Sequence, residues 1–345
     1  MTKRNREKNK NQCLVLRFLK VLVIFSLLLL LVSIPKTTLK AKKSDLAKKV
    51  FVIGHRGAAG LYPENTLAGF ERALDIGVDG IELDILTAAD GVLCVHHDYC
   101  LRPEIARISD KQWLDSKLKI PIKSKTFEEL QAYDIGKLKP YTSYASRYPD
   151  QQAIDGERIP ALREVIALMK QRKTDNAKLW IEIKTSPEQP DMTPPPEVVV
   201  KKVLKVIHDE NFESRVLVLS FDWRNLALVQ KMAPQIPTAH VAATKKGLDN
   251  IKRGQPGPSP WTAGIDVDDY KGSIPHSIHA AGGKIWVAWG KELTKRKVQT
   301  AHELGLKIFV WTIDSTRDMK KFLKMDVDGI ITNRPDRAKN LLSQS

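Results

Sequence analysis

The sequence between residues 50 and 98 reads VFVIGHRGAAGLYPENTLAGFERALDIGVDGIELDILTAADGVLCVHHD. Two apolar runs within it, at 50–54 and 80–85, are typical of buried strands. The segment between them has apolar residues at helical spacing, and Asn65 or Thr66 is expected to cap its helix. A strand, a helix and a second strand in this order predict a parallel α/β fold.

The same alternation continues to the C-terminus. The segments with the composition of strands are 50–54, 80–85, 92–96, 178–184, 215–221, 237–242, 263–267, 307–313 and 328–332. A closed barrel of this class has eight parallel strands, so the pattern predicts a (β/α)8 TIM-type barrel with one surplus candidate, for which we choose 263–267. A doubly wound open sheet is the structural alternative. The spacing of Gly54, Gly57 and Gly60 does not support it, because it differs from that of a dinucleotide-binding loop.

The region after the second strand departs from a regular barrel. Asp90 and Gly91 form a hairpin signal, which allows the strand at 92–96 to run antiparallel to its neighbour. Residues 99–160 carry few long apolar runs. We interpret them as an insertion after the third strand that lies over one mouth of the barrel.

The first 49 residues differ from the domain predicted at 50–345. They carry +11 of the net charge of +16. An apolar segment at about 14–34 predicts an uncleaved signal-anchor that crosses the membrane, with a cleaved signal peptide as the alternative. The basic residues before it favour an extracytoplasmic body, held at the membrane or secreted after cleavage. The body has no zinc-finger spacing and no basic helix, which argues against nucleic-acid binding.

Three carboxylates are placed at strand ends with matching phase. Glu82 and Asp84 are two residues apart on one predicted strand, so their side chains share a face, and Glu182 lies on another strand. In a barrel of this class the functional site is built where the strands end. A cluster of carboxylate oxygens suits a hard divalent cation, so we expect a site for Ca²⁺ or Mg²⁺. The alternative for any single carboxylate is a surface ion pair.

Two histidines and two cationic side chains end strands beside these carboxylates. His55 and His97 could be metal ligands, an acid–base pair or hydrogen-bonded core residues, and their position at strand ends favours acid–base chemistry. Arg56 offers a planar fork that fits a phosphate, and Lys184 adds a second positive charge. Both cations could equally neutralise the carboxylates.

Short motifs in a fixed order carry a resemblance to a known family. They are HRG at 55–57, PENT at 63–66, ELD at 82–84, HD at 97–98, EIK at 182–184, VWT at 310–312 and TNRPD at 332–336. With these motifs the chain resembles the glycerophosphodiester phosphodiesterases, of the phospholipase-C-like phosphodiesterase barrel superfamily, over nearly all of 50–340. The resemblance implies hydrolysis of a glycerophosphodiester substrate to sn-glycerol 3-phosphate and an alcohol.

The resemblance also implies a role for each matching residue. The implied roles are acid–base catalysis by His55 and His97, phosphate binding by Arg56 and Lys184, and binding of one divalent cation by Glu82, Asp84 and Glu182. Glu64 and Asn65 are implied to line or support the substrate site. Trp311 is implied as an apolar wall against the glycerol carbons, with barrel core as its alternative. Asn333 departs from the family pattern, which often has Asp there, and we interpret this position as structural.

Other functions stay open at this point. The same chemistry on lysophospholipids, a lysophospholipase D activity, is one alternative, and a non-catalytic, membrane-tethered binding protein is another. A phospholipase C acting on bilayer lipids is a further alternative, against which the intact carboxylate cluster argues. The sequence does not choose a head group, the nucleophile, the acid among the two histidines or an oligomeric state.

Overall fold

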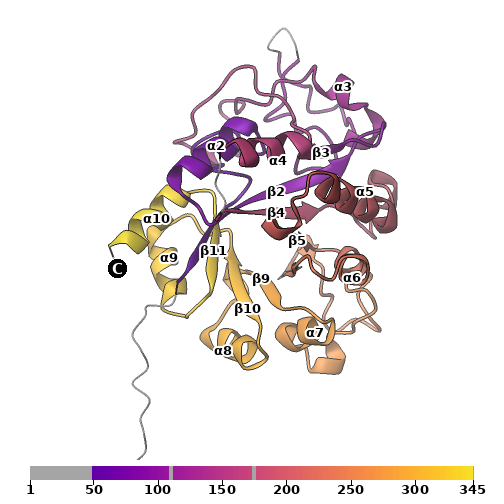
Figure 1. The fold of residues 1–345 in the computed structure, drawn as a ribbon, viewed down its shortest axis with the longest axis vertical. Helices are drawn as coiled ribbons and strands as arrows, with labels where there is room; N and C mark the ends of the chain where they lie inside the picture. The colour runs from indigo at the N-terminus through magenta and orange to yellow at the C-terminus, as the bar shows by residue number, and fades with distance from the viewer. Residues whose placement is uncertain (1–48, 109–111, 173–175, 345) are drawn as a thin grey trace, which may run out of the picture. The chain divides into compact units, whose positions relative to one another are not determined.

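The computed structural model describes residues 49–344, except 109–111 and 173–175. Its centre is a parallel barrel, shown in Figure 1. The barrel strands are β1 (Phe51–Gly54), β2 (Gly80–Thr87), β4 (Lys178–Ile183), β5 (Val216–Ser220), β6 (Thr238–Ala242), β9 (Ile285–Trp289), β10 (Lys307–Trp311) and β11 (Gly329–Thr332). β1 pairs with both β2 and β11, which closes the sheet. The predicted eight-stranded α/β barrel is confirmed.

Two strand assignments differ from the expectation. The strand at 92–96 exists as β3 (Leu93–Val95) and pairs antiparallel with β2, as the hairpin signal at Asp90 and Gly91 allowed, but it lies at the edge and is not one of the eight barrel strands. The surplus candidate 263–267 is indeed no strand, because Ala263 and Gly264 have φ values of 53° and 86°, which no extended chain has. The barrel strand that the sequence reading missed is β9, whose run IWVAW pairs with β6 and β10.

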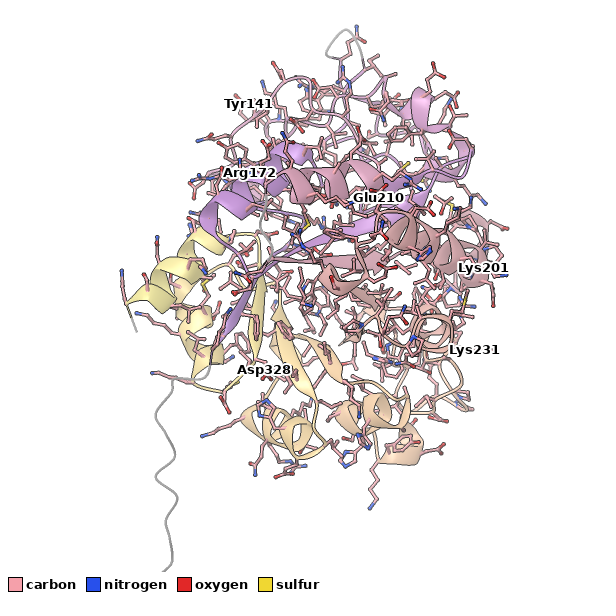
Figure 2. The ribbon with its side chains drawn as sticks, viewed as in Figure 1. Tyr141, Arg172, Lys201, Glu210, Lys231 and Asp328 are labelled. Carbon is pink, nitrogen blue, oxygen red and sulfur yellow. The ribbon has the colours of Figure 1, made fainter. Side chains whose placement is uncertain are left out.

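Helices cover the outside of the barrel. They are α2 (Leu67–Ile76), α4 (Leu162–Gln171), α5 (Pro196–Asp209), α6 (Trp223–Met232), α7 (Ile274–Ala280), α8 (Lys295–Glu303), α9 (Thr316–Leu323) and α10 (Pro335–Ser343). Figure 2 shows charged side chains such as Lys201 on α5 and Lys231 on α6 pointing to solvent. Thr66 caps α2 by accepting a hydrogen bond from the Gly69 N–H at 3.1 Å, which leaves the Asn65 side chain free for another contact.

Two apolar layers hold the barrel together. One lies between the strands and the helices and includes Phe70, Val200 and Met319. The other fills the barrel interior and includes Trp180 and Phe309, whose ring centroids are 4.6 Å apart. Burial of such apolar surface is the main stabilising term for a fold of this size.

The insertion after β3 has a small core of its own. Leu101, Leu114, Ile122 and Ile159 are buried within it, beside the short helix α3 (Phe127–Leu130). The predicted insertion is therefore a packed structure that lies at the top of Figure 1.

The predicted signal-anchor at about 14–34 lies outside the described residues. The predicted boundary between the N-terminal segment and the barrel domain, at residue 49, therefore stays a prediction. None of the helices in the described part of the chain combines the length and the apolar character needed to cross a bilayer.

Candidate active site

A cavity of about 880 Å³ opens at the carboxyl ends of the barrel strands. Seven predicted site residues line it, namely His55, Arg56, Glu82, His97, Glu182, Lys184 and Trp311. The other three, Glu64, Asn65 and Asp84, are buried and hydrogen-bonded to site residues. The residues that the sequence singled out therefore come together at the end of the barrel where such folds place their sites.

The three predicted metal ligands form one cluster. Asp84 on β2 and Glu182 on β4 are direct partners in the sheet register, and Glu82 precedes Asp84 by two residues. All three are buried, and one oxygen from each lies within 4.8 Å of the others. Burial and the neighbouring Asp84 carboxylate raise the pKa of Glu82 well above its usual range. This donor set suits a hard divalent cation, whose charge would stabilise the ionised carboxylates.

Arg56 is held over the cluster by its own backbone and by two acids. Its φ of 50° turns the main chain so that its N–H donates to Glu82 Oε2 at 2.9 Å. Nη1 donates to Glu64 Oε1 at 2.8 Å, while Nε lies 3.4 Å from Asp84 Oδ2. Nε is buried and makes no hydrogen bond among the described residues, and Arg56 is one of the residues that line the cavity.

Lys184 is the second cation of the cluster. Its Nζ lies 2.9 Å from Glu182 Oε1 and 3.3 Å from Asp84 Oδ1. Burial opposes ionisation of Asp84, but His97, Lys184 and Arg56 together lower the pKa of Asp84 below its usual range. Asn65 supports the same carboxylate by donating to Asp84 Oδ2 at 3.0 Å.

Each histidine has a hydrogen-bond partner at Nδ1. His55 Nδ1 lies 2.7 Å from Asn333 Oδ1, and His97 Nδ1 lies 2.7 Å from Asp98 Oδ1. Burial, followed by the charge of Arg56, lowers the pKa of both imidazoles to about 4. His96, the neighbour of His97 in the sequence, is buried and is not among the residues that line the cavity.

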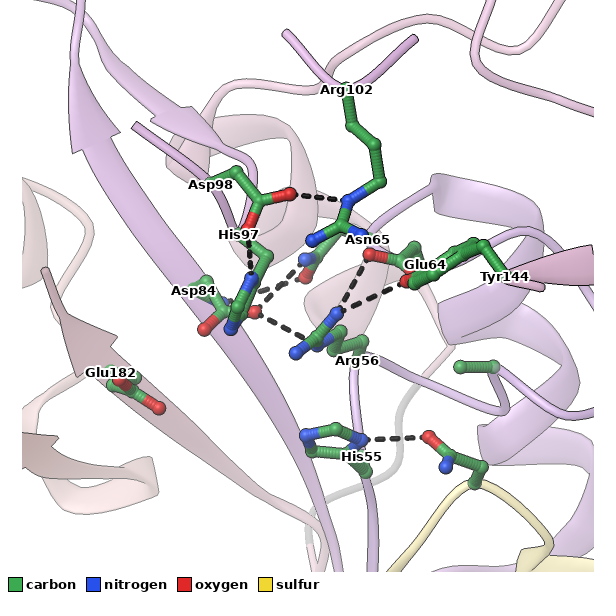
Figure 3. A network of polar contacts seen from close by, with 12 residues as sticks. His55, Arg56, Glu64, Asn65, Asp84, His97, Asp98, Arg102, Tyr144 and Glu182 are labelled. Atoms are coloured by element: carbon green, nitrogen blue, oxygen red, sulfur yellow. Dashed lines mark hydrogen bonds and ion pairs between the residues drawn. The ribbon is translucent and has the colours of Figure 1, made fainter. Parts of the chain in front are cut away.

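Three residues that were not predicted as site residues, Asp98, Arg102 and Tyr144, complete a polar network, which Figure 3 shows. Asp98 joins His97 to Arg102 through a hydrogen bond from Arg102 Nε. The Arg102 guanidinium lies 4.4 Å from the ring centroid of Tyr144, whose hydroxyl donates to Glu64. Asp98 follows His97 directly and could have been chosen. Arg102 and Tyr144 come from the insertion, and no local pattern marks them.

The opposite side of the cavity is apolar. Leu219, Val241, Val287 and Ile331 line it and are nearly fully buried. Trp311 lies at the end of β10, with its ring edge-to-face with Phe221 at a centroid distance of 5.5 Å. Trp311 thus belongs both to the cavity wall and to the barrel interior.

Comparisons with known proteins agree with this site. A model of the Glycerophosphoryl diester phosphodiesterase family matches residues 55–337. A glycerophosphodiester phosphodiesterase of Caldanaerobacter subterraneus subsp. tengcongensis is 31% identical over 294 residues, which cover 85% of this chain and 98% of that protein. Another, of Bacillus altitudinis, is 33% identical over 287 residues, which cover 83% and 96%.

A crystal structure gives the same relationship. It is that of a proposed glycerophosphoryl diester phosphodiesterase from Silicibacter pomeroyi DSS-3, which is 31% identical, has a TM-score of 0.77 and covers 86% of this chain and 94% of that one. These matches place the chain among the phosphoric diester hydrolases that are built on a TIM barrel. Within that class it belongs to the glycerophosphoryl diester phosphodiesterase family.

Proposed function

We propose that this chain hydrolyses glycerophosphodiesters to sn-glycerol 3-phosphate and an alcohol, with a carboxylate-bound divalent cation and the histidine pair. The observation that carries the proposal is the convergence of both histidines, both cations and the acidic cluster on one cavity. The names of the relatives support the same activity.

The cation would be held by Glu82, Asp84 and Glu182, and the all-oxygen donor set favours Ca²⁺ or Mg²⁺. When bound, such an ion supplies Lewis-acid polarisation of a phosphoryl oxygen and lowers the pKa of a coordinated hydroxyl or water.

The two cationic side chains would bind the phosphate. Arg56 and Lys184 both line the cavity, and their positive charges are fixed beside the acidic cluster. Charge gathers on the phosphoryl oxygens in the transition state, so fixed donors at this place stabilise it more than the ground state. Glu64 would support this arrangement by accepting a hydrogen bond from Arg56, and Asn65 would support it by donating one to Asp84.

The histidines would move the protons. One imidazole accepts the proton of the attacking hydroxyl, from the substrate or from water, at its unprotonated Nε2, and the other imidazole, in its imidazolium form, gives its Nε2 proton to the leaving alkoxide. Both rings bind their partner through Nδ1, which leaves Nε2 of each for this exchange. Trp311 and its apolar neighbours would contact the glycerol carbons.

The structure favours a small substrate over a lysophospholipid. Several apolar residues of the insertion, including Leu114 and Ile122, are buried in its own core and do not line an acyl groove. The residues that this region contributes to the cavity include the polar Asp98, Arg102 and Arg147. Attachment to a membrane through the N-terminal segment, with the barrel extracytoplasmic, is kept as part of the proposal because the predicted anchor precedes the barrel.

Turnover by the purified full-length chain tests the proposal. Glycerophosphocholine, glycerophosphoethanolamine and glycerophosphoglycerol are each expected to release glycerol 3-phosphate, and the relative kcat/KM values would give the head-group preference. Lysophosphatidylcholine serves as the comparison substrate. Release of lysophosphatidic acid from it without turnover of the three small diesters would replace the proposal by the lysophospholipase D alternative. No turnover of any of the four by the folded, metal-supplemented chain would contradict an enzymatic function.

A further inference from the structure

We propose that Asn333 and Asp314 are positioning residues that hold the His55 imidazole in the tautomer with its proton on Nδ1. The inference rests on the proposed function, in which His55 exchanges a proton with the reacting groups. It extends that function to two residues that act on the reaction through His55.

Asn333 links the histidine to a carboxylate. Its Oδ1 lies 2.7 Å from His55 Nδ1, and its Nδ2 donates to Asp314 Oδ2 at 2.8 Å. The other oxygen of Asp314 accepts from the Asn333 main-chain N–H at 2.8 Å and from the Thr332 hydroxyl at 3.0 Å. Asn333 is 6% exposed, so few water molecules can replace these contacts.

This arrangement determines which way the amide faces. A carboxylate that already accepts from the Asn333 N–H and the Thr332 hydroxyl acts as an acceptor, so the NH₂ group of Asn333 must be the end that faces Asp314. The carbonyl oxygen is then the end that faces His55. A carbonyl oxygen attracts an N–H and repels a nitrogen lone pair, so Nδ1 of His55 must carry the ring proton.

The consequence falls on the other ring nitrogen. In this tautomer Nε2 of His55 has a lone pair, and Nε2 lies 4.0 Å from Glu82 Oε2 on a ring that lines the cavity. With the amide reversed, Nε2 would carry the proton and could not accept one from an attacking hydroxyl. Asp314 therefore sets the chemistry of His55 through the orientation of the Asn333 amide.

Nitrogen NMR of the full-length chain labelled with ¹⁵N-histidine tests this inference without substrate. The chemical shifts of the two ring nitrogens distinguish the tautomers, and the His55 signals are identified by their loss in His55→Gln. Four variants are compared with the wild type: Asp314→Asn, Asn333→Asp, the double variant that carries both changes, and Asn340→Asp on the exposed face of α10 as a matched control. Steady-state kcat and KM are measured for each.

The wild type is expected to show His55 protonated at Nδ1. Asp314→Asn removes the charge that orients the amide, so a mixture of tautomers and a fall in kcat of about tenfold with little change in KM are expected. Asn333→Asp places two carboxylates against each other and should also lower kcat. The double variant exchanges amide and carboxylate, so the new carboxylate can accept from both the new amide and His55 Nδ1, and both tautomer and kcat should recover.

Two results would overturn the inference: a wild-type His55 protonated at Nε2, or an Asp314→Asn variant whose tautomer and kcat match those of Asn340→Asp. If both single variants fail to fold, the tautomer of His55 in the wild type decides the inference alone. A wild type without turnover but with the expected tautomer would contradict the proposed function alone.

Discussion

The two halves of the barrel mouth are built on the same kind of strand but end in different chemistry. The charged half consists of β1, β2, β4 and the loop after β3, and it carries the acidic cluster and both histidines. The apolar half consists of β5, β6, β9, β10 and β11, and it carries Leu219, Val241, Val287, Trp311 and Ile331. Buried charge is costly unless a ligand or partner compensates it. Arg56 and Lys184 compensate part of this charge, and the charged half is therefore where the proposed cation and the phosphate of the proposed substrate would bind.

The largest effect is expected in the charged half, from His97→Ala. A positioned acid–base group contributes on the order of 10²–10⁴ in rate, so kcat should fall by about a thousandfold. His208 on α5 is a surface histidine with a side chain that is 81% exposed, and His208→Ala is the matched control that should leave kcat unchanged. A His97→Ala variant that folds and retains near-wild-type kcat would contradict the proposed acid–base role of His97.

A smaller loss of activity is expected when the hydrogen bond between Tyr144 of the insertion and Glu64 of the charged half is removed. Tyr144→Phe keeps the ring under Arg102 but deletes the hydroxyl that donates to Glu64, the carboxylate that holds Arg56. Loss of one hydrogen bond to a charged group should lower kcat/KM by roughly tenfold. Tyr141→Phe, on a fully exposed side chain, is the control. Equal kinetics for the two variants would mean that the insertion has no part in placing Arg56.

Substitutions in the apolar half are expected to change KM more than kcat. Trp311→Leu removes cavity-wall surface without touching the acidic cluster, so KM should rise roughly fivefold, as expected for about 1 kcal/mol, while kcat changes little. Trp311→Phe keeps an aromatic ring beside Phe221 and should recover part of the loss. A large fall in kcat with unchanged KM would show that the apolar half takes part in the chemical step as well.

The smallest effect on activity is expected from a substitution of His240, which should instead change the pH dependence of stability. His240 on β6 is 1% exposed and packs edge-on against Trp223, and burial lowers its pKa from 6.5 to about 3. Between these two pH values the unfolded chain binds a proton at this residue and the folded chain does not. Its contribution to stability is therefore complete above pH 6.5 and is lost as the pH falls toward 3.

His240→Leu should accordingly flatten the fall of unfolding free energy with acid, by up to about 1.4 kcal/mol per pH unit in that window. Urea unfolding between pH 4 and pH 7 measures the slope, and His279→Leu on the exposed face of α7 is the control. An unchanged slope would show that His240 is protonated in the folded chain.

Much of the charged half could be predicted from the sequence because its residues lie in short motifs at strand ends, where strand phase fixes their direction. The relations between distant segments could not. Tyr144 reaches Glu64 across 80 positions, and Asn333 reaches His55 across 278, so no local periodicity marks either contact. β9 was also missed, although its run IWVAW has the composition of a strand. Position 333, interpreted as structural, contacts His55 directly.

The central claim is that the acidic cluster makes the charged half a cation-dependent site for phosphodiester hydrolysis. The most direct test is release of glycerol 3-phosphate from glycerophosphoglycerol by the full-length chain after exhaustive chelation, then after return of Ca²⁺ or Mg²⁺, with Glu182→Gln measured in parallel. We predict activity that chelation abolishes, that one of the two ions restores, and that Glu182→Gln lowers at every ion concentration. Activity that survives chelation and the loss of the Glu182 carboxylate would contradict the account.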